Sequence, residues 1–137
     1  MSHAGDVTPA EAYAAVSGPE AALLVDVRTR AEWTYVGVPV VEGAHHDVLF
    51  VEWSTFPDGR VNARFVDELR AAGVGPGRPV YLLCRSGVRS RAAAETLTAA
   101  GLGPAFNVLE GFEGPHDAEG HRTVAGWKVA GLPWRQG

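Results

Sequence analysis

Apolar residues along this chain fall into two patterns, continuous runs typical of buried strands and spaced positions typical of amphipathic helices. The runs at 21–27 and 79–83 are almost uninterrupted, as expected for parallel strands buried on both faces. A further strand is predicted at 104–109, and a weaker one around 43–46. These strands are separated by segments with helical spacing, so strands and helices alternate along the chain.

Capping residues predict where the helices begin. Thr8 and Glu11 form a capping box for a helix that starts at Pro9 and ends near position 16. Thr29 caps a short helix over 30–33, and Asn62 caps one over 63–72. Two further helices are predicted at 91–101 and 123–130. The alternation predicts an α/β domain with a mostly parallel sheet.

Composition agrees with one folded domain. The chain has 137 residues, of which 46% are hydrophobic and 20% charged, so a single domain spanning 1–137 is expected, with its core at about 7–133. A net charge of −4 argues against broad binding to nucleic acids or anionic membranes. No signal peptide or apolar run of about 20 residues is visible, so we expect a cytoplasmic protein.

The only cysteine lies where the predicted chemistry is concentrated. Cys84 follows the apolar run 79–83 and precedes a helix, so its thiol is expected beside backbone N–H groups at the positive end of that helix. This environment stabilises a thiolate and binds an anion next to it. No histidine adjoins Cys84, so activation is expected to depend on these dipoles and on nearby cations.

Three arginines, Arg85, Arg89 and Arg91, accompany the cysteine in an otherwise acidic protein. Cations at a helix N-terminus oppose the helix dipole, so their presence indicates an anionic ligand. Small residues at Ser86 and Gly87 would let backbone approach that ligand closely. We therefore predict Cys84 as the catalytic residue, and the rest of the loop as the substrate-binding residues: Arg85, Ser86, Gly87, Val88, Arg89 and Ser90.

Other polar residues are expected to have structural roles. Asp26 and Arg28 would orient loops near the sheet edge, with Arg28 able to reach Glu32 four positions on. His45 and His46 are adjacent, so in a strand they would point to opposite faces, and neither a metal site nor a cofactor is predicted. Among the tryptophans, Trp53 is the best candidate to line a pocket mouth.

Three segments together resemble the rhodanese family. They are the loop Cys84-Arg85-Ser86-Gly87-Val88-Arg89-Ser90, the stretch Leu24-Val25-Asp26-Val27-Arg28 with Glu32-Trp33, and Leu109-Glu110-Gly111-Phe112 with the later segment 126–133. The resemblance implies a single rhodanese-like domain with a five-stranded, mostly parallel sheet and helices on both faces. It also implies a sulfurtransferase in which Cys84 takes sulfur from a donor such as thiosulfate as a persulfide, then passes it to a thiol or cyanide.

One segment departs from the family pattern. The family usually has Gly-His-Ile-Pro-Gly-Ala after its early signature, whereas here Val36-Gly37-Val38-Pro39 is separated from Gly43-Ala44 and the histidine is missing. The loop itself is intact, so the departure concerns the pocket wall and the choice of substrate.

Two other functions use a similar loop. A persulfide carrier or interaction module would receive its sulfur from a partner in a sulfur relay, and the same loop would serve it. A phosphatase or arsenate reductase of related fold needs Cys, five residues, then Arg, whereas Arg89 follows Cys84 after four residues and position 90 is serine. The shorter loop favours a sulfur atom over a tetrahedral phosphate.

Overall fold

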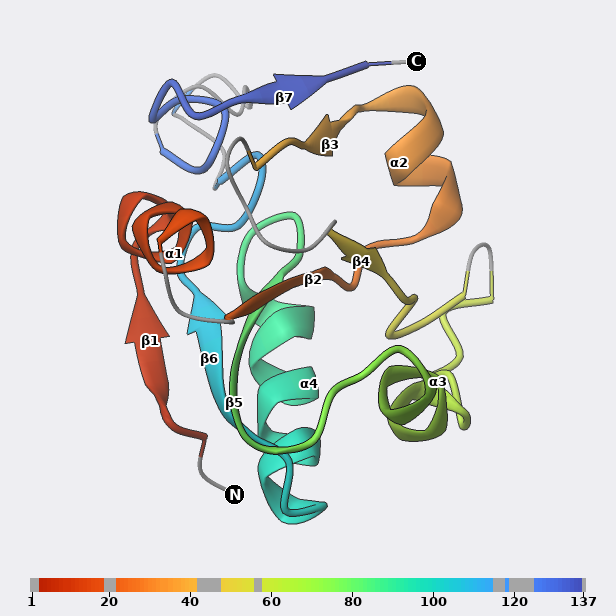
Figure 1. Ribbon diagram of the computed structural model, residues 1–137. Coiled ribbons are helices and arrows are strands. Elements are labelled where there is room, and N and C mark those ends of the chain that lie inside the picture. The colour runs from red at the N-terminus through yellow and green to blue at the C-terminus, as the bar shows by residue number, and fades with distance from the viewer. Residues whose placement is uncertain are drawn as a thin grey trace.

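The central feature of the structure is a parallel sheet of five strands in the order β1-β6-β5-β2-β4 (Figure 1). This computed structural model describes residues 3–18, 22–41, 48–55, 58–114, 118 and 125–136. The strands are β1 (Gly5–Val7), β2 (Leu23–Asp26), β4 (Leu49–Phe50), β5 (Pro76–Leu83) and β6 (Gly103–Val108). The predicted α/β fold with a mostly parallel five-stranded sheet is confirmed.

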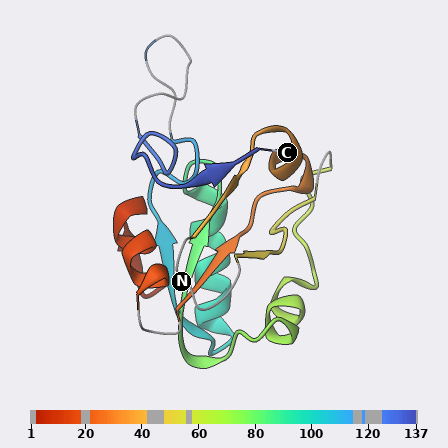
Figure 2. The same ribbon diagram turned by 45° about the horizontal axis from the view of Figure 1, so that its top comes forward.

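Helices cover both faces of the sheet, as predicted (Figures 1 and 2). Helix α1 (Pro9–Ser17) packs on one face, and α3 (Phe65–Ala71) and α4 (Val88–Ala99) pack on the other. The short helix α2 (Arg30–Tyr35) follows β2 and lies beyond the end of the sheet (Figure 1). Alternate residues of β2 divide the core: Val25 packs with residues of α3 and α4, whereas Leu24 packs with residues of α1 and with Trp127. Burial on both faces explains why β2 reads as a continuous apolar run.

A second, small sheet joins the segment after α2 to residues near the end of the chain. Strand β3 (Val38–Pro39) pairs antiparallel with β7 (Trp134–Arg135). Gly37, just before β3, has a φ of 124°, and a Cβ there would lie 2.9 Å from the carbonyl oxygen of Arg135. The close approach therefore requires glycine. Neither of these two-residue strands was predicted, because such short segments carry no periodicity.

The caps predicted at Thr8 and Thr29 are confirmed, whereas the cap predicted at Asn62 is wrong, and two helix starts were misplaced. The predicted capping box of Thr8 with Glu11 is present, and Thr29 caps α2 as predicted. The structure adds that Glu32 completes a second capping box with Thr29. Helix α4 begins at Val88 rather than at 91, because Gly87 serves as its N-cap with a φ of 108°. Helix α3 begins at Phe65 without a side-chain cap, and Asn62 instead accepts a hydrogen bond from the backbone N–H of Arg64.

Two further predictions concern a helix near the end of the chain and a short strand around position 45. Residues 125–130 form turns, so the helix predicted over 123–130 is wrong for the part that the structure describes. The short strand expected at 43–46 lies outside the described residues. Within the described ranges, no helix has the length and apolar character needed to cross a membrane.

Candidate active site

Cys84 lies directly beyond β5, at the carboxyl edge of the parallel sheet, four residues before α4 begins. Open α/β sheets bind ligands at this edge. The residue is only 1% exposed, and the backbone N–H of Gly87 donates a hydrogen bond to its Sγ over 3.1 Å. The predicted contact between the thiol and a backbone N–H of the loop, at the N-terminus of a helix, is therefore present.

The first two carbonyl groups of the loop are directed toward residues 112–114. The carbonyl oxygen of Cys84 accepts from the N–H of Phe112 at 2.8 Å, and that of Arg85 accepts from the N–H groups of Glu113 and Gly114. Gly111 makes this approach possible, because a Cβ there would collide with the carbonyl oxygen of Cys84. This segment thus fixes the peptide orientations of the loop, a role that the sequence motif 109–112 did not reveal.

On its other side, the cysteine meets Ser90, which lies in the first turn of α4. Ser90 Oγ is 3.2 Å from Cys84 Sγ and donates to Asn107 Oδ1 over 2.6 Å. Ser90 and Asn107 are 0% and 3% exposed. Asn107 lies in β6 opposite Leu82 of β5, so strand register brings it to the loop. Nothing in the sequence near Cys84 pointed to Asn107.

The three arginines of the loop have different surroundings. The side chain of Arg85 is exposed, and no hydrogen bond or ion pair joins it to another described residue. Arg89 binds Glu32 through two hydrogen bonds, of 2.6 and 2.9 Å. Arg91 lines a different cavity, together with Asp6. The predicted cluster of cations is therefore divided, with Arg85 as the accessible charge.

The Glu32–Arg89 pair is ionised over the neutral pH range. Burial on its own would raise the pKa of Glu32, but hydrogen bonds from Arg89 and the Thr29 backbone outweigh it and lower the pKa to about 2. The hydrogen bond to Glu32 raises the pKa of Arg89 in turn, against the effect of burial, and the charge of Glu32 adds to that increase. Arg89 thus remains a cation near the sulfur while being held by a carboxylate.

The expectation that Arg28 reaches Glu32 was wrong. Arg28 instead binds the Asp26 carboxylate, with Nη2 2.7 Å from Oδ2, and donates to the carbonyl oxygen of Gly37. Helix α2 begins only at Arg30, so the i,i+4 spacing that would join residues 28 and 32 in a helix does not apply. Both Asp26 and Arg28 are completely buried, in agreement with the structural role expected for them.

A cavity of about 400 Å³ opens beside Arg85 and Arg89, between α2 and the segment after β4. Its lining residues are Thr29, Ala31, Glu32, Val36, Ser54, Thr55, Gly59, Arg85 and Arg89. Trp53 does not line it but packs edge-on against Phe65, with ring centroids 5.1 Å apart. Ser86, Gly87 and Val88 line the cavity on the other side of the loop, and Val88 is 77% exposed.

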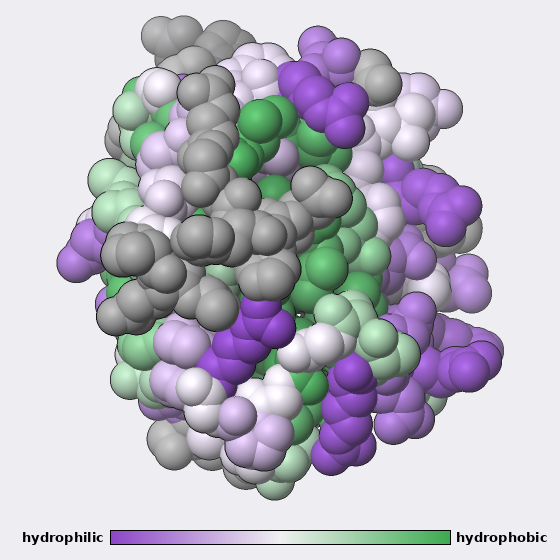
Figure 3. Space-filling model, in the orientation of Figure 1, coloured by the Kyte–Doolittle hydropathy of each residue, from purple (hydrophilic) through white to green (hydrophobic). Residues whose placement is uncertain are grey.

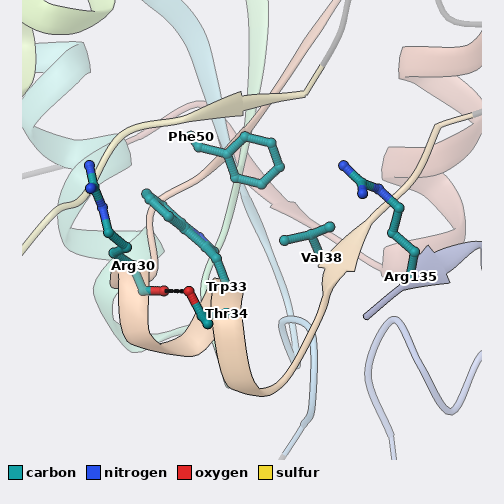
Figure 4. Close-up of a pocket in the computed structure, with 6 residues that line it drawn as sticks. All are labelled: Arg30, Trp33, Thr34, Val38, Phe50 and Arg135. Carbon is teal, nitrogen blue, oxygen red and sulfur yellow. Dashed lines mark hydrogen bonds between the residues drawn. The ribbon is translucent and has the colours of Figure 1, made fainter. Parts of the chain in front are cut away.

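A separate cavity of about 470 Å³ lies on the other face of α2, where Figure 4 shows Trp33, Phe50 and Val38 between Arg30 and Arg135. It contains none of the predicted site residues. Figure 3 shows hydrophobic surface, in green, near the centre of the molecular face seen in Figure 1. Helix α2 therefore separates an arginine-lined cavity beside the cysteine loop from a more aromatic one.

Comparisons with known proteins agree with this geometry. The family model for the rhodanese-like domain matches residues 8–118. The chain belongs to the rhodanese-like domain family. A crystal structure of Rv0390 from M. tuberculosis is 54% identical, with a TM-score of 0.89 over 99% of this chain and 100% of that one. An uncharacterised protein of Rickettsia conorii is 33% identical over 95% of this chain and 96% of its own.

A second, less similar solved structure shares the fold. The solution structure of the polysulfide-sulfur transferase homodimer from Wolinella succinogenes is 22% identical, with a TM-score of 0.61 over 96% of this chain and 77% of that one. Among the described residues of this rhodanese-like domain, no three His, Cys, Asp or Glu side chains gather as metal ligands. His45 and His46 lie outside the described residues.

Proposed function

We propose that this protein is a sulfurtransferase that moves sulfane sulfur from a small anionic donor, such as thiosulfate, to a thiol or cyanide through a persulfide on Cys84. The observation that carries the proposal is the hydrogen bond from the Gly87 N–H to Cys84 Sγ, at the start of α4 in a rhodanese-like domain. An N–H directed at the sulfur stabilises negative charge on a thiolate and on a persulfide. We expect the protein to act in the cytoplasm, where a lone thiol stays reduced.

The proposed reaction has two displacement steps. The Cys84 thiolate attacks the outer sulfur of thiosulfate, the S–S bond breaks, and sulfite leaves with the bonding electron pair. An acceptor thiolate then attacks the outer sulfur of the persulfide and releases the Cys84 thiolate. Arg85 is the side chain we assign to the sulfonate of the donor, because it is exposed and lines the 400 Å³ cavity. Arg89, held by Glu32, supplies a second positive charge beside the same cavity.

The other loop residues complete the proposed binding site. Ser86 and Gly87 supply backbone near the sulfur, Ser90 contacts the sulfur itself, and Val88 lies at the exposed surface of the loop. The name of the Wolinella neighbour supports sulfur transfer as the class of reaction. We expect no cofactor or metal to be needed, because both steps are displacements at sulfur.

A second candidate function is a persulfide carrier that receives sulfur from a relay protein. The observation that favours it is Val88, an apolar side chain that is 77% exposed within the loop, where a partner protein would make contact. The phosphatase or arsenate reductase alternative is less compatible with the site, because Glu32 already occupies both terminal nitrogens of the Arg89 guanidinium.

Intact-mass analysis after incubation with thiosulfate tests the proposal. We expect a mass increase of about 32 Da, the mass of one added sulfur atom, that is lost again after cyanide treatment. The matched control is Cys84→Ser, which should fold normally and gain no mass. A thiosulfate-treated wild type of unchanged mass that gains sulfur from a cysteine desulfurase would favour the carrier. No gain from either donor would overturn the proposal that Cys84 carries sulfur.

A further inference from the structure

Four polar side chains form a continuous hydrogen-bonded line from the cysteine to the edge of the sheet. Cys84 Sγ lies 3.2 Å from Ser90 Oγ, Ser90 Oγ lies 2.6 Å from Asn107 Oδ1, and Asn107 Nδ2 lies 3.2 Å from Asp6 Oδ1. We call these four residues the Asp6 network. Its members come from the loop, α4, β6 and β1, and Asp6 is the register partner of Asn107 in the parallel pair β1–β6.

The carboxylate at one end fixes the direction of every hydrogen bond in the Asp6 network. An ionised Asp6 only accepts, so the amide of Asn107 must present Nδ2 to it and Oδ1 to Ser90. A serine hydroxyl has a single hydrogen, and that of Ser90 is donated to Asn107 Oδ1. Ser90 therefore faces the sulfur with lone pairs only, and the remaining donor for this contact is the S–H of Cys84 itself.

Two groups consequently act on the sulfur in opposite directions. The N–H of Gly87 favours a thiolate, whereas the lone pairs of Ser90 favour a protonated thiol. We propose that Asp6 is a positioning residue that, through Asn107 and Ser90, limits the thiolate fraction of Cys84 in the resting protein. This inference rests on the proposed function, in which the Cys84 thiolate is the nucleophile.

Other charges surround the two ends of the Asp6 network. At the Asp6 end, His3 Nε2 is 2.8 Å from the carboxylate, and this hydrogen bond, against the effect of burial, lowers the pKa of Asp6. Arg91 is also near that carboxylate. At the cysteine end, Arg89 interacts electrostatically with Cys84, and Glu32 and Asp26 interact in turn with Arg89. Arg85, the next residue in the chain, carries a further positive charge on an exposed side chain. These charges act through space, whereas the effect we propose needs the Ser90 hydroxyl as its last link.

The substitution Asp6→Asn tests the proposal. A side-chain amide at this position can donate to Asn107 Oδ1, which lets the Asn107 amide turn and donate to Ser90. The Ser90 hydroxyl is then free to donate to the sulfur and stabilise the thiolate. We expect the pH midpoint of Cys84 alkylation by iodoacetamide to fall by about one unit, which is about a tenfold faster reaction below the midpoint. An unchanged pH profile would overturn the proposal.

The same substitution in a Ser90→Ala background separates the network from simple loss of charge. Removing the carboxylate favours a thiolate electrostatically in any background, but the hydrogen-bond effect requires the hydroxyl. We expect Asp6→Asn to change the alkylation rate less than about twofold when Ser90 is absent. Equal effects in both backgrounds would refute the assigned role. Glu110→Gln is the matched control, because Glu110 lines the same cavity as Asp6 and lies outside the Asp6 network.

Alkylation is chosen because it requires only the thiolate and no sulfur donor. If the protein gained no sulfur from any donor but the alkylation profile shifted as expected, the proposed function would fail and the role of Asp6 would stand. If sulfur transfer occurred but the profile was unchanged in Asp6→Asn, the role of Asp6 would fail alone.

Discussion

Two carboxylate–arginine pairs near the loop, Asp26–Arg28 and Glu32–Arg89, use the same chemistry in different surroundings. Both side chains of the first pair are completely buried, whereas Glu32 and Arg89 keep 18% and 25% of their side-chain surface exposed. Arg28 of the first pair also donates a hydrogen bond to the carbonyl oxygen of Gly37, and its guanidinium lies 4.2 Å from the ring centroid of Phe112. The second pair lines a cavity. Burial therefore distinguishes an arginine that organises the fold from one that lines a cavity while Glu32 holds its terminal nitrogens.

The largest expected effect comes from breaking the buried pair. Arg28→Met should lower the free energy of unfolding by about 3–5 kcal/mol, because it leaves the Asp26 carboxylate buried without its partner. Denaturant unfolding followed by fluorescence measures the change. The double substitution Asp26→Asn with Arg28→Met should recover part of the loss. If Arg28→Met lowered the free energy of unfolding by less than about 1 kcal/mol, the buried pair would stabilise the fold no more than a surface pair does, and the contrast between the two pairs would be wrong.

A smaller effect, with a defined pH dependence, is expected for the half-buried pair. The pKa of Glu32 is lowered to about 2 from its ordinary 4.5, so the folded state gains stability above pH 4.5 and loses it as the pH falls toward 2. The wild type should therefore exceed Glu32→Gln in unfolding free energy by about 1–3 kcal/mol at pH 6, with a smaller difference at pH 3. Denaturant titrations at both pH values check this, and a difference independent of pH would contradict it.

The smallest energetic effect is expected at the accessible arginine. Arg85→Ala should raise the KM for thiosulfate about tenfold, which corresponds to about 1.4 kcal/mol, and leave stability within about 0.5 kcal/mol of the wild type. The side chain of Arg85 has no partner among the described residues, so its removal leaves no carboxylate unpaired. Steady-state kinetics and unfolding curves test the two halves of this statement. Arg89→Ala is the comparison, because it should impair both thiosulfate use and stability.

Sequence alone predicted those parts of the molecule whose signals are local. The strands β2, β5 and β6 have long apolar runs, and the caps at Thr8 and Thr29 are recognised from the residues next to them. Strand β1 has three residues and depends on pairing with β6, which is a hundred positions away in the chain. Short segments held by distant partners leave no periodic pattern to read.

The same limit applied to the site. The sequence identified Cys84 and its loop, and the structure places an amide of that loop at the sulfur. The pairing of Arg89 with Glu32 joins residues 57 positions apart, and Asn107 reaches Ser90 only through the register of β6 on β5. Arg28 was given the wrong partner because the helical spacing was assumed to begin at position 28, whereas the helix begins at Arg30.

Gly111 has a practical consequence for protein engineering. The peptide groups of Cys84 and Arg85 are oriented by backbone hydrogen bonds to residues 112–114. The absence of a side chain at position 111 allows the two segments to come this close. A seven-residue loop transplanted into another scaffold would lack this support and would be free to rotate its peptides. A graft that retains the chemistry must therefore carry two separate stretches of chain, the loop and the glycine turn behind it.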